Sequence, residues 1–128
     1  MSKHENPIET QSAKLRSLAR SKPSKNGMRA VQDGLESKWE GVEAAALNVL
    51  LAWGGKDAVS LARKNLEKHL GDKSGCTIRR AAIAVLAKHI TVRDVAWVNE
   101  LERQVSGDGL MLHELRKLSK RAQELKKS

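Results

Sequence analysis

In this sequence, the type and spacing of the Lys and Arg residues give the clearest indication of binding chemistry. Among 128 residues, 24 are Lys or Arg and 15 are Asp or Glu, which gives a formal net charge of +9. Residues 11–30 contain six of the basic residues and no acid. Cations gathered in this way can neutralise the phosphates of a nucleic acid, which produces a salt-dependent affinity without sequence preference. The candidate polyanion-binding residues are Lys14, Arg16, Arg20, Lys22, Lys25, Arg29, Arg79, Arg80, Lys88 and Arg93.

A second interpretation of this charge stays open. Lys and Arg also cover the solvated faces of ordinary helices, where they bind no partner. No aromatic side chain interleaves with the basic run, although proteins that bind single-stranded nucleic acids stack bases on such side chains. Nucleic acid is therefore one of two partner classes that the sequence allows, and a protein is the other.

Residues that could catalyse a reaction or hold a metal do not form a recognised pattern. The four histidines, at positions 4, 69, 89 and 113, include no HExxH pair, and a single cysteine cannot supply a CxxC motif. No serine lies in a GxSxG turn, and no glycine-rich loop has the spacing that cradles phosphates. His69 and Cys76 could meet across a turn, but two ligands do not make a zinc site. We therefore expect no enzyme activity, no metal and no cofactor.

Cysteine usage and hydropathy bear on the compartment. The single cysteine, Cys76, cannot form an internal disulfide, which fits a reducing environment. No apolar run approaches the ~18 residues of a membrane span, and the first ten residues lack the apolar stretch of a signal peptide. We expect a cytoplasmic protein without a membrane partner, while these features leave its oligomeric state undetermined.

Composition and periodicity predict an all-α fold. The chain has no Phe, no Tyr and three Trp, so its core must be aliphatic, and its Ala, Leu and Lys residues favour helices. Gly54 and Gly55 are expected to end one helix, with Asp57 as the N-cap of the next and Thr91 with Asp94 as a capping box further on. The expected helices include residues 36–53, 58–70, 77–89 and 109–126, one that follows Thr91, and one or two short helices within residues 1–34.

The same pattern of apolar residues occurs twice in the sequence, with an offset of 36 residues. Residues 42–54 and 78–90 can be superposed with their apolar positions in register, and the register extends through the helices that follow. The matched pairs include Val42 with Ile78, Ala46 with Ala82, Leu50 with Leu86, Val59 with Val95, and Ala62 with Val98. A pair of antiparallel helices repeated at this length is typical of an α-solenoid, in which each hairpin buries its apolar face against its neighbour. A six-helix bundle with a coincidental similarity is the alternative.

Large ring side chains occupy related positions in this pattern. The tryptophans at positions 39, 53 and 97 lie on helical apolar stripes, so we expect most of them to lie in the core or to pack between helices. His89 stands where the first repeat has Trp53, and a packing or surface role is expected for its ring.

The stretch IRRAAIAVL, residues 78–86, resembles the first-helix signature of HEAT and HEAT-like repeats. Ile78, Arg79, Ala82 and Leu86 fill positions of that signature, and the resemblance covers about residues 36–105. In that family the arginine contacts an aspartate in a turn between repeats, and the resemblance assigns this role to Arg79. Glu43 stands at the equivalent position of the first repeat. The resemblance implies a fold and no specific activity.

The resulting organisation is a basic N-terminal arm, residues 1–34, followed by a helical repeat domain, residues 35–128. Its repeats are expected at about residues 36–71 and 72–107, with a C-terminal capping helix at about residues 109–126. We expect that deletion of residues 1–30 would leave the helicity nearly intact, because the two repeats lie beyond residue 35. Binding of an unidentified protein partner by the exposed helical surface is the leading expectation for function, and nonspecific nucleic-acid binding is the alternative.

Overall fold

Every regular element in the part of the chain that the computed structural model describes, residues 7–72 and 75–127, is a helix. The prediction of an all-α fold is therefore confirmed. The elements are α1 (Pro7–Ala19), α2 (Lys25–Leu35), α3 (Glu40–Trp53), α4 (Gly55–Lys68), α5 (Cys76–His89), the short 3-10 helix η1 (Val92–Asp94), α6 (Val95–Gln104), α7 (Gly109–Glu114) and α8 (Arg116–Lys127). None of these helices is long and apolar enough to cross a membrane.

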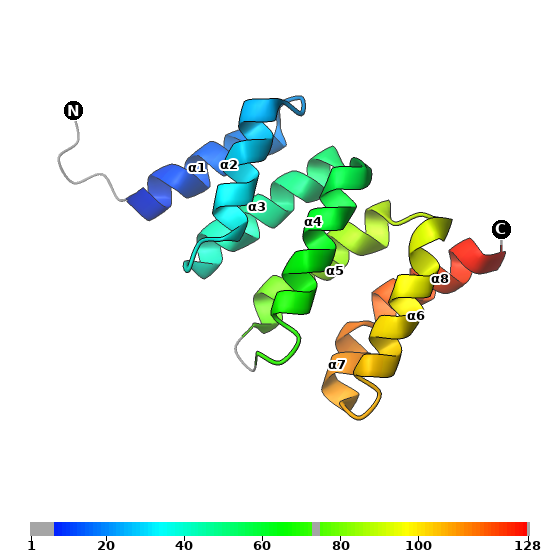
Figure 1. Ribbon diagram of the computed structural model, residues 1–128. Helices are drawn as coiled ribbons and strands as arrows, with labels where there is room; N and C mark the ends of the chain where they lie inside the picture. The colour runs from blue at the N-terminus through cyan, green and yellow to red at the C-terminus, as the bar shows by residue number, and fades with distance from the viewer. Residues whose placement is uncertain (1–6, 73–74, 128) are drawn as a thin grey trace, which may run out of the picture.

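The helices stack as successive hairpins in two layers (Figure 1). In one layer α1, α3, α5 and α8 lie side by side, and each packs against the next. The other layer contains α2, α4 and α6, and each of these packs against the first helix of the following unit. Because α2 and α4 make few direct contacts, a groove separates them.

The core is aliphatic and lies between the two layers. Residues matched by the 36-residue pattern are buried in both repeats: Ala46 and Ala82 have no exposed surface, and the same is true of Leu50 and Leu86. Alanine lets neighbouring helices approach closely, and each leucine buried in this way contributes about 1.5–3 kcal/mol to stability. The repeated apolar pattern thus corresponds to repeated packing positions.

The described part of the N-terminal segment, residues 7–34, contributes to this core. Residues 1–6 lie outside the described part of the chain. Residues 7–34 form the two predicted helices, but both pack against α3, and Leu15 and Val31 are almost completely buried. Gly34 of α2 lies between Leu15 and Ala46, where a Cβ atom would come within 3.0 Å of each side chain. Deletion of residues 1–30 would therefore expose the apolar side of α3, which argues against the expectation that helicity would stay nearly intact.

Two of the three predicted helix-end signals are confirmed. Gly54 and Gly55 have φ angles of +68° and +90°, the left-handed region that L side chains rarely adopt. The capping box is present, and the Thr91 amide donates to a carboxylate oxygen of Asp94 at 2.9 Å. Asp57 is not an N-cap, because α4 begins at Gly55 and places Asp57 in its first turn. The helix predicted at residues 109–126 is divided into α7 and α8.

Replacing Gly54 with alanine tests how tightly the α3–α4 turn is packed. A Cβ atom there would lie 2.5 Å from Cε1 of His89, on a backbone held at a φ of +68°. We expect Gly54→Ala to lower the free energy of unfolding by about 2–4 kcal/mol, because steric overlap adds to backbone strain. Gly55→Ala meets open space and should cost the strain alone, about 1–2 kcal/mol. Urea titrations would measure both losses, and equal losses would contradict the packing of His89 against this turn.

Candidate nucleic-acid interface

The turns from α1 to α2, from α3 to α4 and from α5 to η1 lie along one edge of the molecule (Figure 1). Trp53, the last residue of α3, joins the first two of these turns. Its indole Nε1–H donates to the carbonyl oxygens of Leu18 at 3.0 Å and of Ser21 at 2.8 Å, at the end of α1. Carbonyl groups at a helix end need partners from outside the helix, and the indole supplies one.

His89 makes the same kind of contact one repeat later. Its Nε2 atom lies 2.6 Å from the carbonyl oxygen of Leu51, near the end of α3. A carbonyl oxygen only accepts hydrogen bonds, so Nε2 carries the ring proton in this contact. The ring also lies against Gly54, which brings the end of α5 beside the α3–α4 turn. The equivalence of His89 and Trp53 in the sequence is therefore matched by an equivalent contact in the fold.

We define the basic edge as these three turns, residues 20–25, 54–57 and 88–94, together with the end of α8. This helix contacts η1, and Figure 1 shows its C-terminal end on the same side of the molecule. Five of the candidate cations lie on the edge, and all are exposed: Arg20, Lys22, Lys25, Lys88 and Arg93. The edge also contains exposed cations that are not among the ten candidates: Lys56, Lys126 and Lys127. Lys56 belongs to no basic run, so only the stacking of the hairpins reveals it.

Few acids accompany these cations. The first turn has none, Asp57 follows Lys56 in the second, and the third has Asp94, whose carboxylate is bound by the Thr91 amide. The opposite edge is formed by the turns from α2 to α3, α4 to α5 and α6 to α7. Among the described residues of this edge, the exposed acids are Glu36, Glu40, Asp72 and Asp108, and the exposed cations are Lys38 and Lys68. Among the residues that the structure describes, the basic edge thus carries more positive charge than the opposite edge.

Two edge cations stand where helix electrostatics disfavour them. Lys25 is the first residue of α2, whose first turn contains no acid, and Lys56 is the second residue of α4. A helix N-terminus carries a partial positive charge, so a favourable acid there is worth about 0.3–1 kcal/mol, and a lysine opposes the same field. That field also attracts anions. A residue type that is locally unfavourable for stability is typical of a functional surface.

Four other candidates lie elsewhere on the surface. Lys14 and Arg29 line a hollow of about 410 Å³ between α1 and α2, which Asp33 also lines. Arg16 and Arg80 are exposed on α1 and α5, outside the three turns. The fold therefore brings half of the ten candidates together.

Arg79 is the tenth candidate, and it is buried. Its Nε and Nη2 atoms donate to the two carboxylate oxygens of Glu114 at 2.6 and 3.0 Å, and Nη1 donates to the carbonyl oxygens of His69 and Asp72. The hydrogen bonds between Arg79 and Glu114 raise the pKa of the guanidinium and lower the pKa of the carboxyl, although desolvation opposes each shift. The prediction that Arg79 contacts a polyanion is therefore corrected, because the hydrogen-bond donors of its guanidinium are used inside the fold.

Glu43, the equivalent residue of the first repeat, is also buried and also fastens helices together. Its Oε2 atom accepts hydrogen bonds from Asn65 Nδ2 and from His69 Nε2, both at 2.6 Å. His69 is the C-cap of α4, and its Nδ1 atom lies 3.4 Å from a carboxylate oxygen of Asp72. The two repeats therefore place opposite charges at one position, and both are satisfied near the end of α4.

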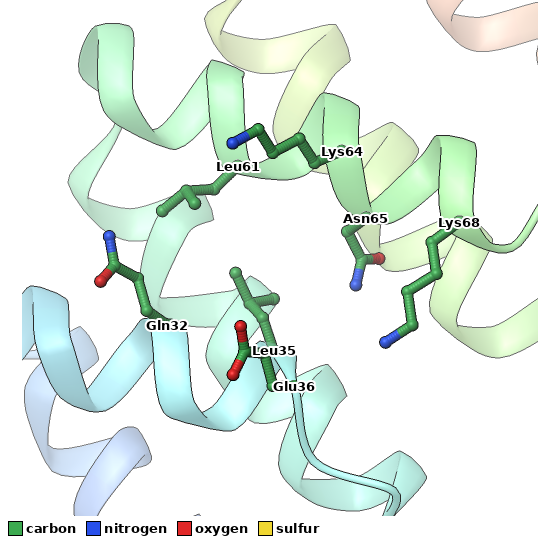
Figure 2. A pocket seen from close by; sticks show the side chains of 7 residues that line it. All are labelled: Gln32, Leu35, Glu36, Leu61, Lys64, Asn65 and Lys68. Atoms are coloured by element: carbon green, nitrogen blue, oxygen red, sulfur yellow. The ribbon is translucent and has the colours of Figure 1, made fainter.

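A groove of about 300 Å³ lies between α2 and α4 (Figure 2). It is lined by Gln32, Leu35, Glu36, Leu61, Lys64, Asn65 and Lys68. The Oδ1 atom of Asn65 has no hydrogen-bond partner in the part of the chain that the structure describes. Because Glu36 offsets part of the charge of Lys64 and Lys68, the groove is less basic than the edge.

The tryptophans differ in their surroundings. Trp39 is 48% exposed at the N-cap of α3, and the Lys38 ammonium lies 5.4 Å from its ring centre. Trp39 is therefore the exception to the expectation that most of the tryptophans pack. Trp53 and Trp97 are partly buried and pack against the core, as expected.

No group of three or more His, Cys, Asp or Glu side chains within the described residues could hold a metal ion. Comparison of the chain with protein-family models, with curated proteins and with solved structures gave no match. Function must therefore be inferred from the geometry of the basic edge.

Replacing Glu114 with glutamine should weaken the fold in a pH-dependent way. At neutral pH we expect Glu114→Gln to lower the free energy of unfolding by about 1.5–3 kcal/mol, the range for hydrogen bonds to charged groups. Because the pKa of Glu114 is lowered in the folded protein, this contribution is complete above the unfolded carboxyl pKa of about 4.3. The stabilising contribution is lost as the pH falls through the lower pKa that Glu114 has in the folded protein.

Urea titrations of the protein and of Glu114→Gln at neutral and acidic pH would measure this difference. The matched control is Glu100→Gln, which breaks an exposed pair with Arg103 at 3.0 Å and should change stability by less than about 0.5 kcal/mol. A loss in Glu114→Gln that stays constant from neutral pH to strong acid would contradict the ionic pairing with Arg79.

Proposed function

We propose that this protein is a short HEAT-like helical repeat module that binds nucleic acids by their phosphate backbone and catalyses no reaction. The observation that carries the proposal is the exposure of Lys22, Lys25, Lys56, Lys88 and Arg93 on three adjacent turns. The three turns are distant in sequence and lie along one edge only because the hairpins stack. An extended set of cations suits a polyanion with repeated charges better than it suits a single small anion.

The chemistry of the basic edge favours binding without sequence preference. Base recognition needs side chains that form paired hydrogen bonds in a groove, or aromatic surfaces on which bases stack. The edge presents mainly Lys and Arg, and Trp53 uses its N–H group within the fold. Contacts should therefore go to phosphates, which position a protein on a nucleic acid without reading its sequence.

Two observations support the HEAT-like part of the proposal. The hairpins stack, and the positions matched at 36 residues are buried in both repeats. Arg79, the arginine of the family signature, donates to the backbone carbonyl of Asp72 in the turn between α4 and α5. The resemblance implies a contact between that arginine and an inter-repeat aspartate, and here the aspartate's backbone takes the bond.

A protein partner is the second candidate, and a different surface favours it. The groove between α2 and α4 has Leu35 and Leu61 in its lining (Figure 2). Trp39 is half-exposed at the α2–α3 turn. Exposed aromatic side chains are enriched in protein interfaces. A protein bound there would leave the basic edge accessible, so the two functions can be tested separately.

The salt dependence of duplex binding tests the proposed function. If the edge contacts about 4–6 phosphates, log affinity for a labelled DNA duplex should fall with log salt at a slope of about −4 to −5. Lys25→Glu combined with Lys56→Glu should weaken binding and reduce that slope by about 2. The matched control, Lys64→Glu with Lys68→Glu, makes the same change of net charge on exposed positions of α4 outside the edge and should have a much smaller effect. Fluorescence anisotropy titrations would measure all three proteins.

Two outcomes would reject parts of this proposal. Equal losses of affinity in both double variants would show that net charge alone matters, and would reject the basic edge as the binding site. Failure of the unmodified protein to bind DNA or RNA duplexes at low salt would reject the nucleic-acid function and leave the protein partner as the remaining candidate.

The same edge substitutions should have the opposite effect on stability. Lys25→Glu and Lys56→Glu each place an acid in the first turn of a helix, where it interacts favourably with the helix dipole. We expect each to raise the free energy of unfolding by about 0.5–1 kcal/mol. Thermal melts followed by circular dichroism would show the gain. A loss of stability would contradict the described starts of α2 and α4.

A further inference from the structure

The basic edge contains a cavity large enough for more than a phosphate group. It lies between α4 and η1 and has a volume of about 620 Å³. Lys56, Arg63 and Arg93 line it, and Ser60 and Thr91 add two hydroxyl groups. Cavities of about 300–1,000 Å³ are typical of sites for small organic molecules. Its occupant should therefore combine negative charge with an organic part.

The cations of this cavity face a single acid among its lining residues. That acid, Asp94, accepts a hydrogen bond from the Thr91 amide at 2.9 Å and lies 3.8 Å from the Arg63 guanidinium. Trp97 holds Arg63 from another side, with its ring centre 4.5 Å from the guanidinium carbon. Arg63 thus has two partners within the fold, and Lys56 and Arg93 make no ion pair within the described residues. The cavity keeps a surplus of positive charge.

The remaining wall of the cavity is apolar. Val59 and Val92 line it, and Val92 is 65% exposed. An exposed valine gains from burial only when something covers it. The His89 ring lies in the same wall and is held by its hydrogen bond to Leu51. A firm apolar surface therefore lies next to the cations.

We propose that this cavity binds a nucleoside 5′-phosphate unit. Its phosphate lies among the three cations, where the double negative charge and several acceptor oxygens suit Lys and Arg donors. Its base packs on the two valines, and its sugar lies within the reach of the two hydroxyl groups. The inference rests on the proposed function because the cavity is part of the same edge. The unit is either a free mononucleotide or the phosphorylated end of a strand.

Two pairs of probes test the proposal on the full-length protein. Adenosine 5′-monophosphate should shift the backbone amide signals of Gly55, Ser60 and Thr91 in heteronuclear NMR spectra, and adenosine should bind at least about tenfold more weakly. For strand ends, two DNA duplexes are identical except for the phosphate on a one-nucleotide 5′ overhang. The phosphorylated duplex should bind roughly tenfold more tightly in anisotropy titrations.

One substitution and a matched control locate the effect. Val92→Asp places an acid in the exposed apolar wall, where it should leave folding intact and remove both the nucleotide shifts and the preference for a phosphorylated end. Ala96→Asp makes the same charge change at an exposed position of α6 that does not line the cavity. Ala96→Asp should retain both effects.

The outcomes separate this inference from the proposed function. Duplex binding without any preference for the phosphorylated end, and without nucleotide shifts, would overturn the cavity assignment and leave the proposed function intact. Nucleotide shifts without duplex binding would support the cavity and reject the backbone function. Equal losses in Val92→Asp and Ala96→Asp, or displacement of the nucleotide by an oligoglutamate peptide at equal concentration, would overturn the assignment to a nucleoside phosphate.

Discussion

The ring N–H groups that bind the end of a neighbouring helix determine how the hairpins align. Trp53 and His89 each donate to carbonyl oxygens near the end of the preceding first-layer helix. Because helix ends leave carbonyl groups without partners inside the helix, such a donor satisfies them and fixes the register between two hairpins. Aliphatic packing alone would tolerate some sliding of one helix along the next. The cations of the three turns stay adjacent because this register is fixed.

A second set of polar contacts acts on the other side of the stack. Arg79 and Glu43 occupy the same position in successive repeats, carry opposite charges and are both buried. Arg79 joins α5 to Glu114 and to the α4–α5 turn, while Glu43 joins α3 to Asn65 and His69. A buried charge is tolerated only when its hydrogen bonds are satisfied. This position therefore has the same role in both repeats, which is to hold the first helix of the repeat in place, although the residue type differs.

The basic edge shows a conflict between local stability and surface charge. Lys25 and Lys56 stand at helix starts, where acids would be more favourable, and Val92 is exposed beside the cavity. The core does not need any of these choices, since the buried alanines and leucines already account for the packing of the hairpins. The proposed binding of an anion with repeated charges would account for these choices.

The sequence by itself determined the helices, the 36-residue repeat and core positions such as Ala46 and Leu86. These features depend on residues a few positions apart, and periodicity reports that spacing directly. Only the tertiary structure decided which cations lie on the same edge of the molecule. Lys56 belongs to no basic run in the sequence, yet it lies on the basic edge. Arg79 is a candidate in the sequence, but its guanidinium pairs inside the fold with Glu114, 35 residues further along the chain. Such neighbours depend on which helix ends the stacking brings together, and no local pattern of residues contains that information.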